Sequence, residues 1–181
     1  MTRLPTITAA ALLVAAAFAG NAGATSKDAA STDTCAEQLV PICNKRIVEA
    51  AFAQWRNGGS GIFETLLSPE VVWTIEGSGP SAGTLRGREV LVDAAVRPLS
   101  ERLASPLRPV QQRIWADGEH VIVQWEGVAT LRDGGSYRNR YAWIMRMAGG
   151  KEVEVNAFLD LPVYDAVLQR GRSQMQRRAS P

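Results

Sequence analysis

The chain is poor in the residues that bind metals and form disulfides, with two cysteines and one histidine among 181 residues. Cys35, Cys43 and the distant His120 do not complete a zinc site, which takes four ligands in structural centres. The cysteine spacing also differs from the C-x-x-C of redox pairs. The sequence contains no phosphate-binding loop, dinucleotide fingerprint or serine-nucleophile motif. We therefore expect a protein that needs no metal and no organic cofactor.

Long apolar runs are also scarce, and the single one lies at the N-terminus, over residues 4–20. A positive start precedes the run and small residues follow it, which predicts a secretory signal peptide over 1–24. Cleavage is expected after Ala24, with Ala19 as the alternative. A membrane anchor is the competing interpretation, but the run is short, rich in alanine and contains Pro5. We expect an exported protein, periplasmic or secreted, without stable membrane insertion.

The segment that follows, residues 25–43, reads as a flexible leader, because it begins with small polar residues. In an oxidising compartment the pair Cys35 and Cys43 predicts a disulfide. Such a bond would stabilise the fold by about 2–3 kcal/mol. At the other end, residues 169–181 are rich in arginine and read as a basic disordered tail. A solvated tail is expected rather than a nucleic-acid contact, since exported proteins rarely meet nucleic acids.

Residues 44–168 are long enough for one domain. Their patterns predict a helix from Asn44 to about Arg56, a second helix over 60–67, a strand over 71–76 and a third helix over about 89–103 that Pro98 interrupts. Glycine turns at 117–118, 133–135 and 149–150 then separate the last strands into an antiparallel meander. Helices segregated from such a meander indicate an α+β domain and exclude a doubly wound parallel sheet.

The strand around residues 136–148 has two distinct faces. Alternation places one set of side chains together, namely Tyr137, Asn139, Tyr141, Trp143 and Met145. Arginines occupy the opposite face. A face that mixes large aromatics with a few uncharged polar groups is typical of a small-molecule pocket.

Three phrases carry a resemblance to a known family: VWTIEG at 72–77, AGTLRGRE at 82–89 and GKEVEVNAFLD at 150–160. With the element order, they resemble the SnoaL-like branch of the nuclear transport factor two-like superfamily, over about residues 44–168. The resemblance implies a cone-shaped curved antiparallel sheet wrapped around the N-terminal helices, with a central, mostly apolar pocket. It also implies a possible homodimer through the sheet. This scaffold hosts enzymes, binders and assembly modules alike.

In the ketosteroid-isomerase-like enzymes of this group, a carboxylate in an apolar pocket moves a proton and a neutral donor stabilises the oxyanion. The resemblance assigns the base to Asp160, which matches the family's closing aspartate. Glu76, at the end of the first strand, is the second carboxylate. Tyr137 or Tyr141 is the oxyanion donor. These roles imply cofactor-free isomerase, cyclase or epoxide-hydrolase chemistry.

The direction of the closing strand decides whether Asp160 reaches the pocket. Its residues alone favour a core made by Val153, Val155, Ala157 and Leu159, whereas the resemblance favours Asn156, Phe158 and Asp160 inward. We expect the second arrangement. The predicted ligand-binding residues are Trp73, Trp125, Asn139, Trp143, Asn156 and Phe158, although aromatics at strand positions are often plain core.

Two functions follow from these expectations. One is acid–base chemistry on a small, carbonyl-containing apolar substrate. The alternative is a non-catalytic periplasmic ligand-binding or dimeric interaction module, which export favours.

Overall fold

The structure, a computed structural model, describes residues 39–59 and 62–179. The predicted signal peptide and Cys35 lie outside the described residues, so export and the disulfide stay predictions. Within the described residues, no helix is long and apolar enough to cross a membrane.

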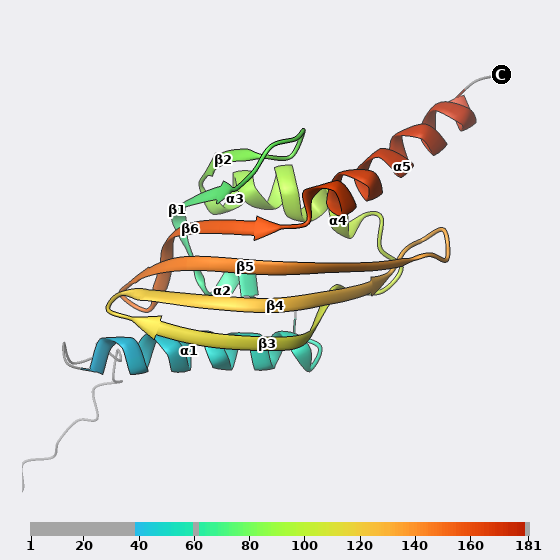
Figure 1. Cartoon of the computed structure of the whole chain (residues 1–181). Helices are drawn as coiled ribbons and strands as arrows, with labels where there is room; N and C mark the ends of the chain where they lie inside the picture. Colours follow the sequence, from blue (N-terminus) through green and yellow to red (C-terminus); the bar gives the residue numbers. More distant parts are fainter. Residues whose placement is uncertain (1–38, 60–61, 180–181) are drawn as a thin grey trace, which may run out of the picture. The chain divides into compact units, whose positions relative to one another are not determined.

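The predicted order of helix, helix, strand, helix and four strands is confirmed, with two additional elements (Figure 1). The elements are α1 (Val40–Arg56), α2 (Ile62–Thr65), β1 (Leu67–Ile75), β2 (Gly83–Arg86), α3 (Arg88–Leu91), the π-helical segment η2 (Val92–Val96), α4 (Arg97–Ser100), β3 (Arg108–Asp117), β4 (His120–Thr130), β5 (Ser136–Ala148), β6 (Lys151–Leu159) and α5 (Leu161–Ala179). The additions are β2, in a stretch read as a loop, and α5.

Both ends of the predicted domain differ from expectation. Helix α1 begins at Val40 and has a proline in its first turn, where the missing N–H is no loss. Asn44, the predicted N-cap, is instead buried inside the helix. At the C-terminus, α5 continues to Ala179 over most of the predicted disordered tail. Once its first turns are anchored, each further residue adds a hydrogen bond, which favours extension.

The sheet is six-stranded, open and curved, in the order β2-β1-β6-β5-β4-β3. The meander from β3 to β6 is antiparallel, as predicted, and its hairpins turn at the predicted glycines. Gly149 and Gly150 both have positive φ, which explains two glycines at one turn. The sheet is mixed rather than wholly antiparallel, because β1 pairs with β6 in parallel. Parallel partners need a long crossover, and the segment from β2 to β5 provides it.

One face of the sheet, called here the inner face, carries the core. The five side chains predicted to share a face of β5 are all buried there, namely Tyr137, Asn139, Tyr141, Trp143 and Met145. Helix α1 lies along β3 and β4 (Figure 1) and adds Val48, Phe52 and Trp55 to the core. Helix α3 lies beside β1 and β2, and α4, which follows η2, contacts α5.

The predicted direction of β6 is wrong. Val155 and Ala157 are 0% and 2% exposed, whereas Phe158 is 45% exposed on the outer face. The reason is the pairing with β5, which sets Val155 opposite Met145 and Ala157 opposite Trp143. Paired residues share a face, so the inner face of β5 determines that of β6.

A register shift in the β5–β6 ladder, between Arg146 and Met147, changes the alternation near the start of β6. A bulge adds one residue to one strand, so side chains on its two sides exchange faces. As a result Glu152, not Val153, is buried in the interior.

Candidate functional site: an aromatic cavity under the sheet

A cavity of about 630 Å³ opens between the inner face of the sheet, the α1–α2 region and the α3–α4 segment. This volume is typical of small-molecule sites. Its walls are mostly apolar and aromatic. They include Trp55, Phe63, Trp73, Ile75, Leu91, Ala95, Val96, Leu99, Leu103, Leu107, Trp125, Tyr141, Trp143, Ala157, Leu159 and Tyr164, with Ser100, Ser105 and Arg108 among the polar residues.

The aromatic wall is built around a stacked pair, Trp125 and Tyr141, whose ring centroids are 3.9 Å apart at 9°. These residues are cross-strand partners in β4 and β5. The rings of Trp143 and Trp125 form a T-shaped pair, with their centroids 4.9 Å apart. Gly127 makes room for the stack, since a Cβ there would lie 2.8 Å from the Trp125 ring. The predicted wall residues Trp73, Trp125 and Trp143 all line the cavity.

The hydroxyl of Tyr141 ends a chain of hydrogen bonds. Asn139 Nδ2 donates to the Tyr137 hydroxyl at 3.2 Å, and that hydroxyl is 2.7 Å from the hydroxyl of Tyr141. Either hydroxyl can be the donor of the bond between the two tyrosines. When Tyr137 donates to Tyr141, the proton of Tyr141 can be given to an oxygen in the cavity.

Burial keeps both tyrosines neutral. It raises the pKa of Tyr141 well above its ordinary value, and the nearby Tyr137 adds to this effect. Burial also raises the pKa of Tyr137, against the opposing effect of its hydrogen bonds with Tyr141 and Asn139. A neutral phenol in this place is a hydrogen-bond donor rather than a base.

Trp125 also carries a hydrogen-bond donor, but that donor is buried. Its Nε1–H has no acceptor among the described residues. A buried donor without a partner costs about 1–3 kcal/mol.

The predicted base, Asp160, does not line the cavity. It is exposed, and it begins α5: its Oδ1 accepts from the backbone N–H of Val163 at 3.4 Å, and its carbonyl accepts from Tyr164 at 3.1 Å. These are the contacts of a helix N-cap. An aspartate at the end of a strand can either cap the following helix or point into a pocket. The sequence alone could not separate these two roles.

Asn139, predicted to orient a substrate, holds the backbone of Asp160. Its Oδ1 accepts from the Asp160 N–H and its Nδ2 donates to the Asp160 carbonyl, each at 3.0 Å. The amide therefore fastens the junction of β6 and α5 to β5, and contributes to the cavity only through Tyr137.

The remaining predicted residues lie on the outer face. Asn156 Nδ2 donates to Glu76 Oε1 at 2.6 Å, and Phe158 is exposed on the same strand. None of these residues lines the cavity, so Glu76 is not placed to act as its second carboxylate. Within the described part of the chain, no carboxylate lines the cavity at all.

Several wall residues were not predicted, because they come from distant elements. Leu91, Leu99 and Tyr164 contribute from α3, α4 and α5. Arg108 donates to the carbonyls of Trp55, Gly58 and Gly59, at 3.0 to 3.1 Å, and so caps the end of α1. The sequence signal for that contact was the position of Arg108 at the start of a strand, between Pro106 and Pro109.

Residues 48–155, more than half of the chain, match the model of the SnoaL-like domain. The chain belongs to the SnoaL-like family. The resemblance seen in the sequence is thereby confirmed, together with the α+β fold. No curated protein matches the chain.

Solved structures of similar fold include proteins described as nuclear transport factor two-like. A protein of this kind from Burkholderia thailandensis E264 has a TM-score of 0.54 and 24% identity, over 69% of this chain and 96% of its own. A candidate SnoaL-like polyketide cyclase from Jannaschia sp. CCS1 has a TM-score of 0.57 and 16% identity, over 71% and 93%. TerC, co-crystallised with polyporic acid, has a TM-score of 0.56 and 17% identity, over 70% and 98%. At these identities the likeness shows the fold alone.

Proposed function

We propose that this SnoaL-like protein binds a small, largely apolar molecule that carries an oxygen acceptor, and does not catalyse a proton transfer. The observation that carries the proposal is the cavity of about 630 Å³, which has aromatic walls, the Tyr141 hydroxyl and, among the described residues that line it, no carboxylate. Apolar burial supplies affinity in such a site, and a few polar groups determine orientation. The co-crystallisation of TerC with polyporic acid supports small-molecule binding by this fold.

Acid–base chemistry at this cavity is less well supported. A general base must come within hydrogen-bond reach of the proton that it removes. Asp160 caps α5 and Glu76 bonds Asn156 on the outer face, so neither carboxylate is directed to the cavity. The Tyr141 hydroxyl can hold a carbonyl oxygen, but holding alone removes no proton.

Tryptophan fluorescence offers a direct test, since four of the five tryptophans line the cavity. The fifth, Trp115, is exposed on β3, so Trp115→Phe removes the background signal. In that background we expect 4-phenylcyclohexanone to change the emission saturably. Phenylcyclohexane, which lacks the oxygen, should bind about tenfold more weakly, the effect of one hydrogen bond of about 1.4 kcal/mol.

Tyr141→Phe is the matched variant. It should remove most of the preference for the ketone and leave the affinity for phenylcyclohexane unchanged. Asp160→Asn is the control and should bind both compounds as the unaltered protein does. If neither compound produces a saturable change, the binding function is wrong. Ketone-dependent turnover that disappears in Asp160→Asn would instead restore the catalytic alternative.

We further propose that two copies associate through the outer face of the sheet. Trp115, Ile122 and Ile144 are consecutive cross-strand partners there, and the first two are 49% and 39% exposed. An apolar row of this kind suits a second copy of the same sheet. Sedimentation equilibrium should give a dimer that Ile122→Lys dissociates. Val90→Lys, at an exposed apolar position on α3, should leave the dimer intact, and a monomeric unaltered protein would exclude this interface.

Export and the disulfide are proposals as well. Expression of the full chain in a bacterial host should yield, outside the cytoplasm, a protein whose first residue is Thr25. Intact mass before and after reduction should then differ by two hydrogens for a Cys35–Cys43 bond. A protein that keeps residues 1–24 and stays in the cytoplasm would contradict the proposed localisation.

A further inference from the structure

Helix α5 lies beyond the part of the chain that the SnoaL-like family model covers, since that match ends at residue 155. Its first turns nevertheless reach the cavity. Leu161, Tyr164 and Val167 are buried, three residues apart, and Tyr164 is one of the cavity's lining residues. An element outside the residues that the family model matches therefore supplies part of the cavity wall.

The start of α5 is held at several separate points. Asn139 of β5 binds the backbone of Asp160, as described above. Asp165 Oδ1 accepts from the hydroxyl of Ser81, in the loop before β2, at 2.5 Å. At the far end of the described side chains, Arg170 lies 3.7 Å from Asp133 in the β4–β5 loop. Anchors on three different segments restrict how far the first turns can move.

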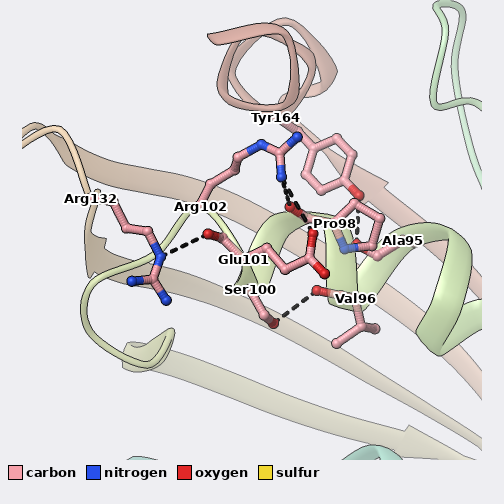
Figure 2. A network of polar contacts seen from close by, with 8 residues as sticks. All are labelled: Ala95, Val96, Pro98, Ser100, Glu101, Arg102, Arg132 and Tyr164. Atoms are coloured by element: carbon pink, nitrogen blue, oxygen red, sulfur yellow. Dashed lines mark hydrogen bonds and ion pairs between the residues drawn. The ribbon is translucent and has the colours of Figure 1, made fainter. Parts of the chain in front are cut away.

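The hydroxyl of Tyr164 is used for position and not for a ligand. It donates to the carbonyl of Ala95 at 2.8 Å, a contact that Figure 2 shows between α5 and the helical wall. Ala95 belongs to the π-helical segment η2, and the next segment, α4, contains Pro98, which has no N–H to donate. Ser100 and Arg102 likewise donate to the carbonyls of Val96 and Pro98 (Figure 2). Side chains thus stabilise the wall that Tyr164 faces.

Tyr164 is also near the donor pair. Tyr137 packs in one apolar cluster with Tyr164, Leu99 and Val167, and Tyr137 is bonded to Tyr141. Tyr164 and Tyr141 both line the cavity, and each is joined to Tyr137, Tyr164 by packing and Tyr141 by a hydrogen bond. Bulk at Tyr164 would therefore limit the group attached next to an oxygen that Tyr141 holds.

We infer that the first turns of α5 form an end wall of the cavity and that Tyr164 determines the size of the group accepted beside the ligand's oxygen. This inference rests on the proposed binding function. Tyr164 is a specificity-determining residue through its ring, while its hydroxyl positions the ring against η2.

The test uses cyclohexyl alkyl ketones whose alkyl chain grows from methyl to pentyl, with tryptophan fluorescence of the Trp115→Phe full-length chain as the readout. Each methylene that finds room should tighten binding about fourfold. In the parent we expect this gain in affinity to stop early in the series. The longest alkyl chain that still tightens binding is called the limit. In Tyr164→Ala it should continue, so that the longer ketones bind at least about tenfold more tightly than to the parent.

Three variants separate size from stability. Tyr164→Leu keeps an apolar side chain in place, should fold if Tyr164→Ala does not, and should move the limit in the same direction. Tyr164→Phe keeps the ring and should keep the parent's limit while lowering the melting temperature, because the bond to Ala95 is lost. Val167→Ala removes volume from the same helix away from the cavity, and should lower the melting temperature without moving the limit.

The outcomes distinguish the two proposals. If cyclohexyl methyl ketone binds but the limit stays unchanged in both Tyr164→Ala and Tyr164→Leu, the inference about α5 is overturned and the binding function stands. If Val167→Ala moves the limit as far as Tyr164→Leu, loosened packing is the cause and the inference is again overturned. If the parent binds none of the ketones, both proposals fail.

Discussion

The two regions of the inner face differ in what they bury. At the cavity, aromatic side chains leave a space of about 630 Å³, and no carboxylate is found among the described lining residues. At the start of β6, Glu152 is 1% exposed and its Oε1 has no hydrogen-bond partner among the residues that the structure describes, yet it does not line the cavity. The cavity has room for a ligand but no described carboxylate, whereas Glu152 is a carboxylate with no cavity beside it.

This difference teaches that a perturbed pKa does not by itself locate a functional site. Burial raises the pKa of Glu152 to about 8, the kind of shift that often marks catalytic acids. Its neighbours in the sheet are Leu67 and Met147, both buried, so a substrate has no room to approach it. The cavity, which a ligand can occupy, instead presents neutral donors. We therefore assign Glu152 to pH-dependent stability and Tyr141 to binding.

The largest expected effect concerns Glu152. Its pKa is about 8 in the folded protein against an ordinary 4.5, so the folded state holds the proton more tightly across that window. Stability should therefore fall as pH rises from about 4.5 to about 8, by about 1.4 kcal/mol per unit and on the order of 5 kcal/mol in all. Urea unfolding at pH 5, 6.5 and 8 measures this loss.

Glu152→Gln should remove most of that dependence, because the amide does not ionise. Glu154→Gln is the matched control: this neighbour is exposed on the outer face and paired with Arg146, so the dependence should persist. An unaltered protein as stable at pH 8 as at pH 5 would remove the contrast between the two regions.

An intermediate effect is expected from Gly127→Ala, which tests the cavity region. The new Cβ would lie 2.8 Å from the Trp125 ring, 3.0 Å from Leu107 and 3.2 Å from the Tyr141 ring. Overpacking of this kind costs about 1–3 kcal/mol. The displaced stack should also weaken ketone binding. Calorimetry and fluorescence titration measure the two effects together.

Gly135→Ala provides the comparison for that variant. Gly135 lies outside the strands, and its added Cβ would meet the flexible side-chain oxygen of Asp133 at 3.1 Å. We expect a small loss of stability and unchanged ketone affinity. Equal effects from both substitutions would mean that the Trp125–Tyr141 stack has no particular role in binding.

The smallest effect is expected at Asp160, which belongs to neither region. As an N-cap it should tolerate Asp160→Asn almost without cost, while Asp160→Ala should lose about 1 kcal/mol. Melting temperatures measure the difference, and ketone affinity should not change in either variant. A loss of ketone binding in Asp160→Asn would place this carboxylate in the cavity and reverse our assignment.

Prediction from the sequence succeeded where the signal was local. Tyr141 and Trp143 were identified because alternation within one strand orders neighbouring side chains without reference to other elements. The hairpin glycines were equally visible. Tyr164 and Leu99 escaped notice, because only the folded chain brings their helices to the same cavity.

The error in β6 has a related cause. Alternation divided the strand into two faces, but the direction of those faces depends on the pairing with β5 and on the register shift beside Met147. A shift of one residue reverses every side chain beyond it, so Glu152 became buried and Val153 did not. The resemblance then favoured Asp160 inward, although the chain uses that aspartate to start α5.

By itself, the sequence determined the meander and the aromatic face of β5, since these follow from short-range periodicity and turn residues. Its resemblance to known sequences indicated the family. Only the tertiary structure decided that Asp160 caps a helix, that Glu152 is buried and that Tyr164 closes the cavity. Those outcomes depend on register and on contacts between segments far apart in the chain, where each side chain's surroundings come from other elements rather than from its own neighbours.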